Sequence, residues 1–264
     1  MYHDGILSII AYGIIVYMRH NAKKVGDLWL LNPPEGVKEY ICNCGKPGNP
    51  VVSQYNILEI SEEQTKNTIV LKNRYSIIDL LAGQGKPMRL MEVGTAAGDY
   101  AQLMADKIKI EKMTLIDKFE DEDIMPDGSG RYSKGKNYQF VVDRFKDNPA
   151  VEVIKSLSNK ALPKFIPMQE KDKFDFIYLD SDHSFHNVYN ELLYASQIVN
   201  QFGVIGIDDF SSATDDPMRP YEVMQAVTTF LHNNIEWKVK FFTFGTESLQ
   251  NIYISRAFNA EANV

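Results

Sequence analysis

Two apolar segments of this chain each end in acidic residues, and one helix-length stretch separates them. Residues 174–179 lead into Asp180, and residues 203–207 lead into Asp208 and Asp209. Such segments are typical of parallel strands joined by a helix, which end at the same edge of a sheet. Ligands of open α/β sheets bind at that edge. The three carboxylates converging there repel one another unless protons or a hard divalent cation neutralise them.

Strand and helix patterns alternate from residue 88 onward. Strands are expected at 89–93, 113–117, 151–154, 174–180, 204–208, 237–244 and 251–255, and helices at 100–108, 138–147, 187–199 and 221–232. Helices between the first five strands predict parallel β-α-β units, whereas the short link between the last two permits only an antiparallel hairpin. We therefore predict an α/β fold with a Rossmann-like sheet of seven strands, five of them parallel, closed by a terminal hairpin.

The chain is expected to have two parts, an N-terminal extension at residues 1–85 and an α/β domain at residues 86–264. Within the extension, Ser61 with Gln64 three residues later predicts a capped helix start. Residues 74–81 have the periodicity of an amphipathic helix. We expect the extension to pack on the domain, to contact a partner subunit or to shape a substrate pocket.

Charge and composition exclude several classes of function. The net charge of −7 and the pI near 5.3 argue against broad nucleic-acid binding, which needs a basic face. The apolar run at residues 6–18 is shorter than the ~20 residues of a membrane-spanning helix, so no stable membrane insertion is expected. Its packing on a partner subunit would give a homo-oligomer. Cys42 and Cys44 are too few for a structural zinc site, and low cysteine usage suits a cytoplasmic location.

A glycine-containing turn after the first strand of the domain indicates a cofactor site. In Glu-Val-Gly-Thr-Ala-Ala-Gly, residues 92–98, Gly94 allows close backbone approach and Gly98 lets the following helix pack on the strand. Asp117 ends the next strand, where a carboxylate can accept both hydroxyls of a ribose. A dinucleotide-binding loop uses the same physics, but it has a glycine at the position of Ala96.

Residues 92–98 have the form Glu/Asp-x-Gly-x-x-x-Gly and resemble motif I of class I S-adenosylmethionine-dependent methyltransferases. Residues 179–185, Leu-Asp-Ser-Asp-His-Ser-Phe, and 208–210, Asp-Asp-Phe, resemble the macrocin O-methyltransferase-like group, methyltransferase family 24. They also resemble the wider metal-dependent group that contains catechol O-methyltransferase. The resemblance covers about residues 88–256. It implies an O-methyltransferase acting on a hydroxylated small molecule, such as a sugar or a glycosylated metabolite.

The resemblance also implies roles for individual residues. Glu92 is expected near the amino group of S-adenosylmethionine, and Asp117 at its ribose. The other expected cofactor contacts are Gly94, Thr95, Ala96, Gly98, Tyr100, Ser156 and Asp180. Asp180, Asp208 and Asp209 are expected to hold Mg²⁺ or another divalent cation. His183 is the expected catalytic base, because an imidazole titrates near neutral pH.

Two other functions stay open at this point: an NAD(P)-dependent oxidoreductase, and a methyltransferase-like binding module without activity. The polar, glycine-rich residues 118–137 follow the second strand and are expected to form a lid over the active-site edge. Arg131 and Tyr132 are its expected substrate contacts. Residues 211–220 are expected to form another wall of the pocket.

Overall fold

The computed structural model describes residues 55–119, 136–210, 222–244 and 250–256, and the backbone of four short strands before them. These strands pair as two antiparallel hairpins, β1 (Ala22–Val25) with β2 (Leu28–Leu31) and β3 (Cys42–Asn43) with β4 (Lys46–Pro47). Several sequence predictions lie outside the described residues. They concern the apolar run 6–18, Cys44, the lid contacts Arg131 and Tyr132, and the segment 211–220.

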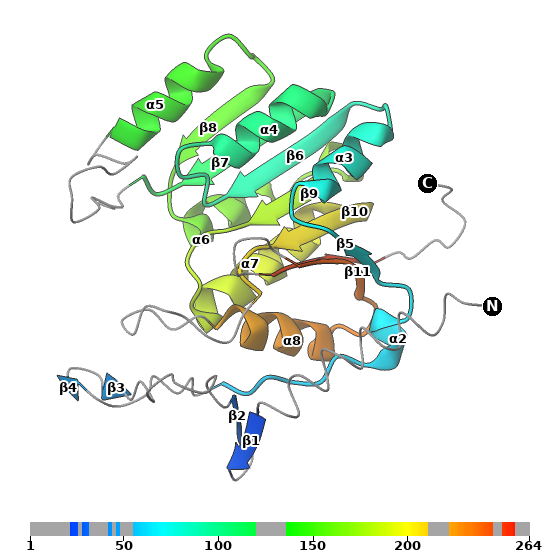
Figure 1. Ribbon diagram of the computed structural model, residues 1–264. Coiled ribbons are helices and arrows are strands. Elements are labelled where there is room, and N and C mark those ends of the chain that lie inside the picture. The colour runs from blue at the N-terminus through cyan, green and yellow to red at the C-terminus, as the bar shows by residue number, and fades with distance from the viewer. Residues whose placement is uncertain are drawn as a thin grey trace.

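An eight-stranded sheet, in the order β5-β11-β12-β10-β9-β6-β7-β8, forms the body of the molecule (Figure 1). Its strands are β5 (Ile69–Leu71), β6 (Met88–Val93), β7 (Ile110–Asp117), β8 (Val151–Lys155), β9 (Phe174–Leu179), β10 (Val199–Ile207), β11 (Lys238–Thr243) and β12 (Asn251–Ser255). Neighbours from β8 to β10 are parallel, and β12 runs antiparallel to both β10 and β11. The predicted Rossmann-like α/β fold, with five parallel strands and a closing hairpin, is confirmed.

The sheet has one strand more than the seven predicted. Strand β5 pairs in parallel with β11 and extends the edge of the sheet. It comes from the predicted N-terminal extension, which therefore contributes directly to the sheet. A three-residue apolar run is too short to show the alternation by which strands are recognised in a sequence, and β5 gains its conformation from its partner strand.

Helices cover both faces of the sheet (Figure 1). One face carries α3 (Ser76–Gly83), α4 (Asp99–Lys107) and α5 (Lys136–Phe145), and the other carries α6 (Ser158–Ala161), α7 (Phe185–Ile198) and α8 (Val223–Asn233). The other helices of the described residues are α2 (Glu62–Thr65), η1 (Leu162–Phe165) and η2 (Glu170–Asp172). The predicted capping box of Ser61 and Gln64 begins α2. None of the helices in the described part of the chain has the length and apolarity that a bilayer crossing requires.

Strand β9 shows how the two cores fix the centre of the sheet. Phe176 and Tyr178 pack into the apolar cluster under α3, α4 and α5, whereas Ile177 and Leu179 pack into the cluster under α6, α7 and α8. All four side chains are buried. A strand covered on both faces reads as a continuous apolar run rather than an alternating one. Packing on both faces therefore fixes the position of the carboxyl end of β9, from which the following residues project.

Candidate active site

Backbone hydrogen bonds bring the carboxyl ends of the central strands together. The N–H of Asp180 donates to the carbonyl of Val93 at 2.8 Å, and the N–H of Asp208 donates to that of Leu179 at 3.0 Å. Gly94, with φ +89°, fits between these strand ends because it has no side chain. A Cβ atom at Gly94 would lie 1.8 Å from the carbonyl oxygen of Asp180. The turn after β6 and the acidic end of β9 thus lie directly against each other.

Glu92 places a buried carboxyl group at the end of β6. Its side chain is almost entirely buried, and this burial raises its pKa to about 8, although the nearby Thr95 hydroxyl opposes the rise. Oε2 of Glu92 has no hydrogen-bond partner among the described residues. A buried polar atom without a partner costs free energy. The position therefore fits a ligand that supplies a hydrogen-bond donor, such as an ammonium group.

Asp117 ties the turn at residues 94–98 to the neighbouring strand β7. Its Oδ2 accepts a hydrogen bond from the N–H of Ala96 at 2.8 Å, and its Oδ1 accepts one from the N–H of Phe119 at 2.6 Å. Ala96 has φ +47°, a left-handed conformation that costs a residue with a Cβ about 1–2 kcal/mol. Ala96 therefore holds the backbone shape that a glycine takes most easily.

The remaining predicted cofactor residues lie around this turn. Gly98, with φ +76°, is the last residue before α4, and Tyr100 in the first turn of α4 stacks on Tyr178 with 4.3 Å between ring centroids. The N–H of Ser156 donates to the carbonyl of Asp117 at 2.9 Å, which places Ser156 beside the end of β7. The predicted cofactor residues thus gather on one stretch of the sheet edge.

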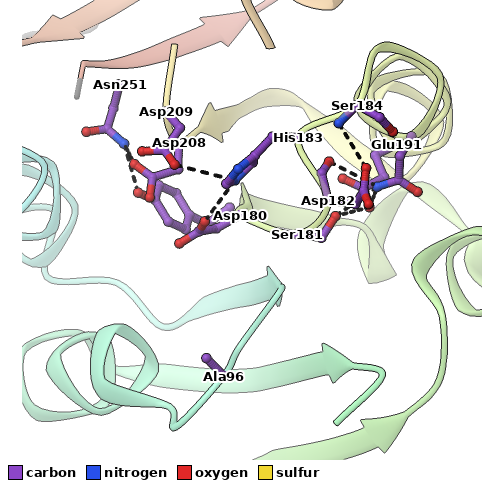
Figure 2. A network of polar contacts seen from close by, with 12 residues as sticks. Ala96, Asp180, Ser181, Asp182, His183, Ser184, Glu191, Asp208, Asp209 and Asn251 are labelled. Atoms are coloured by element: carbon purple, nitrogen blue, oxygen red, sulfur yellow. Dashed lines mark hydrogen bonds and ion pairs between the residues drawn. The ribbon is translucent and has the colours of Figure 1, made fainter. Parts of the chain in front are cut away.

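Asp180, His183 and Asp209 meet at the ends of β9 and β10 (Figure 2). Nε2 of His183 lies 3.6 Å from Oδ1 of Asp180 and 3.5 Å from Oδ2 of Asp209. One potential ligand atom from each of the three residues lies within 4.8 Å of the others. Asp209 reaches this position with φ +50°, a conformation that aspartate tolerates better than most residues.

Asp208, the third predicted metal ligand, has strong partners of its own. Its Oδ2 lies 3.1 Å from Nη1 of Arg74, and its Oδ1 accepts a hydrogen bond from the side-chain amide of Asn251 (Figure 2). Burial and the neighbouring Asp208 raise the pKa of Asp180 well above its usual range. Crowded carboxyl groups of this kind are stabilised by a bound hard cation, so the residues present fit a divalent ion.

The sequence analysis missed Arg74 and Asn251. Arg74 lies just before α3, in the predicted extension, and no motif marks it. Asn251 was open to prediction, because β12 runs antiparallel to β10 and Ile252 pairs with Ile207, so Asn251 lies beside Asp208. A hairpin whose first strand runs parallel to β10 must begin its second strand at the acidic edge, and this topology was the signal that could have found Asn251.

Comparisons with known proteins agree with this architecture. The family model described as a methyltransferase domain, methyltransferase family 24, matches residues 91–210. An O-methyltransferase from Bacillus cereus, solved in complex with SAH, is 16% identical with a TM-score of 0.50, over 68% of this chain and 78% of that one. The O-methyltransferase TomG from Streptomyces achromogenes, involved in tomaymycin synthesis and solved with SAM, is 15% identical with a TM-score of 0.50, over 69% and 78%. No curated protein matches the chain.

At these identities the solved structures establish the fold, and the family match covers the acidic residues and the cofactor residues predicted from the sequence but not Arg74 or Asn251. The matched segment contains the turn at 92–98, Asp117, Asp180, His183 and the pair Asp208–Asp209. Residues 91–210 therefore match a family 24 methyltransferase domain, and the chain has the Rossmann-like fold of the class I S-adenosylmethionine-dependent methyltransferases.

Proposed function

We propose that the chain is a metal-dependent O-methyltransferase that moves the methyl group of S-adenosylmethionine to a hydroxyl group of a small molecule. The observation that carries this proposal is the position of His183. Its Nε2 lies between the carboxylates of Asp180 and Asp209, at 3.6 and 3.5 Å, on the sheet edge that also carries the turn at residues 92–98. An acceptor hydroxyl bound at this edge would lie beside both a proton acceptor and anionic groups.

The cofactor side of the proposal rests on two carboxyl groups. Glu92 would accept a hydrogen bond from the ammonium group of the cofactor's methionine part, which fits its buried and unpartnered Oε2. Asp117 would bind the ribose, while its present bond to the N–H of Ala96 holds the turn in shape. Together they would fix the cofactor at both ends, which an in-line displacement requires.

The methyl transfer breaks the bond between sulfur and the methyl carbon and forms a bond between that carbon and the acceptor oxygen. The hydroxyl proton passes to Nε2 of His183, and S-adenosylhomocysteine leaves. A divalent cation held by Asp180, Asp209 and Asp208 would supply charge that lowers the pKa of the acceptor hydroxyl. Asp180 and Asp209 would orient the acceptor beside His183.

Similar proteins support the choice of oxygen as the acceptor atom. The Bacillus cereus and Streptomyces achromogenes structures are both of O-methyltransferases. The choice of a sugar or glycosylated metabolite rests on the resemblance of residues 179–185 and 208–210 to the macrocin O-methyltransferase-like enzymes.

Calorimetry can test the cofactor and the metal separately. S-adenosylmethionine and S-adenosylhomocysteine are titrated into the protein in Mg²⁺ or in EDTA, with NAD as the control ligand. The proposal expects both sulfur ligands to bind and NAD not to bind. It also expects a separate Mg²⁺ heat that Asp209→Ala removes. Transfer of a labelled methyl group from S-adenosylmethionine to a panel of sugars, glycosides and catechols then identifies the acceptor class.

The possible results separate the competing functions. Binding of NAD alone would support the oxidoreductase and overturn the assignment of the turn at 92–98. Cofactor binding that is indifferent to Mg²⁺ would leave a methyltransferase without the proposed metal step. Cofactor and metal binding without transfer to any member of the panel would favour a binding module.

A further inference from the structure

The loop between β9 and α7, residues 180–184, carries both Asp180 and His183, and it makes several hydrogen bonds that the proposed reaction does not use. We call it the acidic loop. Within it, Oδ1 of Asp182 accepts a hydrogen bond from the N–H of Ser184 at 2.9 Å, which closes a local turn before α7. The other bonds involve Asn187 and two buried glutamates, one within α7 and one directly before α8, and the sequence analysis singled out neither glutamate.

Glu191, on α7, holds the loop beside Asp180. It is buried, and its Oε1 accepts hydrogen bonds from the hydroxyl of Ser181 at 2.5 Å and from the side-chain amide of Asn187 at 2.8 Å. Asn187 also donates to Oγ of Ser181 at 2.9 Å, so the three side chains form a closed triangle (Figure 2 shows Ser181 and Glu191). Ser181 follows Asp180 directly, so this triangle fixes the backbone from which the Asp180 carboxylate projects.

Glu222 holds the other end of the loop, at His183. Its backbone N–H donates to the carbonyl of His183 at 2.9 Å, and its Oε2 accepts a hydrogen bond from the N–H of Phe185 at 2.9 Å. Glu222 is buried and directly precedes α8. One residue therefore fixes the loop through both its backbone and its side chain, on either side of Ser184.

Glu191 is a costly choice for fold stability alone. Burial raises the pKa of Glu191 to about 7, even though the hydroxyls of Ser158 and Ser181 lower it. Desolvating a carboxyl group costs free energy, so an apolar side chain would serve better if the residue only had to pack the helix. A carboxylate that accepts several hydrogen bonds is, however, well suited to fixing the geometry of a loop.

We propose that Glu191 and Glu222 are positioning residues that hold Asp180 and His183 at their present separation on the acidic loop. This inference rests on the proposed function of those two residues. Displacements of about 1 Å at a reactive site lower rates by about 10²-fold, so anchors of this kind have a functional effect that exceeds their effect on folding.

The test uses paired substitutions at each glutamate. Glu191→Gln and Glu222→Gln keep an oxygen acceptor for the same bonds, whereas Glu191→Ala and Glu222→Ala remove it. Gln64→Ala is the matched control, because Gln64 is also buried and its side chain donates to the carbonyls of Leu231 and Trp237 at 2.8 and 3.1 Å. Each variant is measured for melting temperature, S-adenosylhomocysteine affinity, Mn²⁺ affinity and the imidazole NMR signal of His183, assigned with His183→Gln.

We expect the two alanine variants to bind Mn²⁺ about 10–100-fold more weakly, the usual effect of losing a hydrogen bond that orients a metal ligand. Their His183 signal should shift or broaden, while S-adenosylhomocysteine affinity stays within about threefold. The glutamine variants should restore both readouts. Gln64→Ala should lower the melting temperature without changing the Mn²⁺ affinity or the His183 signal. Alanine variants with wild-type Mn²⁺ affinity and an unmoved His183 signal would overturn the inference.

The design keeps this inference separate from the proposed function. If the wild-type protein binds no Mn²⁺, the metal part of the proposed function fails, and the His183 signal alone still decides whether the glutamates position the loop. If Glu191→Ala does not fold, Ser181→Ala removes the same contact from the loop side with the loss of a single hydroxyl. An unchanged His183 signal and metal affinity in a folded Ser181→Ala would then count against the role of Glu191.

Discussion

The guanidinium group of Arg74 lies 3.1 Å from the carboxylate of Asp208, and this contact joins the N-terminal region to the acidic edge of the sheet. The side chain of Asp208 is 8% exposed and that of Arg74 is 34% exposed. Cζ of Arg74 also lies over the ring of Tyr100 in α4, 5.8 Å from the ring centroid. One residue outside the family segment thus contacts both the proposed metal side and the proposed cofactor side of the site.

Arg74→Met should destabilise the fold by leaving Asp208 buried without its cation. Breaking a fully buried pair costs about 3–5 kcal/mol, and the partial exposure of Arg74 reduces the expected cost to about 1–3 kcal/mol. Urea unfolding of the single variants and of the double variant with Asp208→Asn measures the coupling. Lys112→Met is the control, because Lys112 is about as exposed as Arg74 and pairs at 3.0 Å with Glu152, which is half exposed, so it should cost under about 1 kcal/mol in lost charge pairing. Equal costs for Arg74→Met and Lys112→Met would contradict the role given to Arg74.

The fold was largely open to prediction because it depends on regular, long-range patterns. Strand β9 is a short apolar run interrupted only by Asp175, and its length and flanking helices specify a buried parallel strand. Strand β5 could not be predicted, because three residues carry no period and their conformation comes from pairing with β11. The local sequence pattern therefore predicts the central strands, whereas the added edge strand β5 depends on tertiary contact.

The site was predictable where residues follow strand ends, and not where side chains reach in from elsewhere. Asp180 directly follows β9 and Asp209 is the second residue after β10, so topology alone places them at one edge. Arg74, Glu191 and Glu222 come from other elements, and their contacts depend on side-chain directions that the sequence does not encode locally. The preference of Asp208 for Arg74 and Asn251 is likewise a result of packing.

Gly94→Ala should disrupt the junction between the cofactor turn and β9. The added Cβ would lie 1.8 Å from the carbonyl oxygen of Asp180, so backbone must move, and φ +89° is itself unfavourable for alanine. We expect loss of S-adenosylhomocysteine binding and a fall in melting temperature. Gly83→Ala is the matched control, because a Cβ there meets no atom within 4 Å and replaces a glycine at the end of α3. It should stabilise the helix by about 0.5–1 kcal/mol. Wild-type cofactor affinity in Gly94→Ala would refute the close approach.

The buried carboxyl group of Glu92 should make cofactor binding depend on pH. Its folded-state pKa of about 8 means that the free protein carries a proton there at pH 6, and a ligand ammonium group favours the ionised form. S-adenosylhomocysteine affinity should therefore rise between pH 6 and pH 8, by at most about tenfold per pH unit. Glu92→Gln should bind more weakly and lose this rise. A flat profile in the wild-type protein would exclude Glu92 from contact with the ammonium group.

The raised pKa of Glu92 also makes the free energy of unfolding depend on pH. A carboxyl group whose pKa rises on folding from 4.5 to about 8 binds more protons in the folded state, so stability falls as the pH rises through that window. Each pKa unit corresponds to about 1.4 kcal/mol. The free energy of unfolding of Glu92→Gln minus that of the wild-type protein should therefore grow by a few kcal/mol between pH 5 and pH 8. Glu191 titrates in both proteins, so its contribution cancels in the difference.

His183 can act as a base or as a metal ligand, and two substitutions separate these roles. If it is the base, His183→Ala should lower turnover of the acceptor found in the methylation panel by about 10²–10⁴-fold, with cofactor and Mg²⁺ affinities nearly unchanged. Asp209→Ala should abolish Mg²⁺ binding and metal-dependent turnover while sparing cofactor binding.

His186→Ala is the matched control, because His186 is exposed and bonds to the hydroxyl of Tyr55 at 2.7 Å rather than to the acidic residues. A fall in Mg²⁺ affinity in His183→Ala equal to that in Asp209→Ala would make His183 a ligand, and turnover near the wild-type rate would remove it from the mechanism. Because Nε2 lies almost equally far from Asp180 and Asp209, geometry alone permits both roles, and the metal affinity of His183→Ala decides between them.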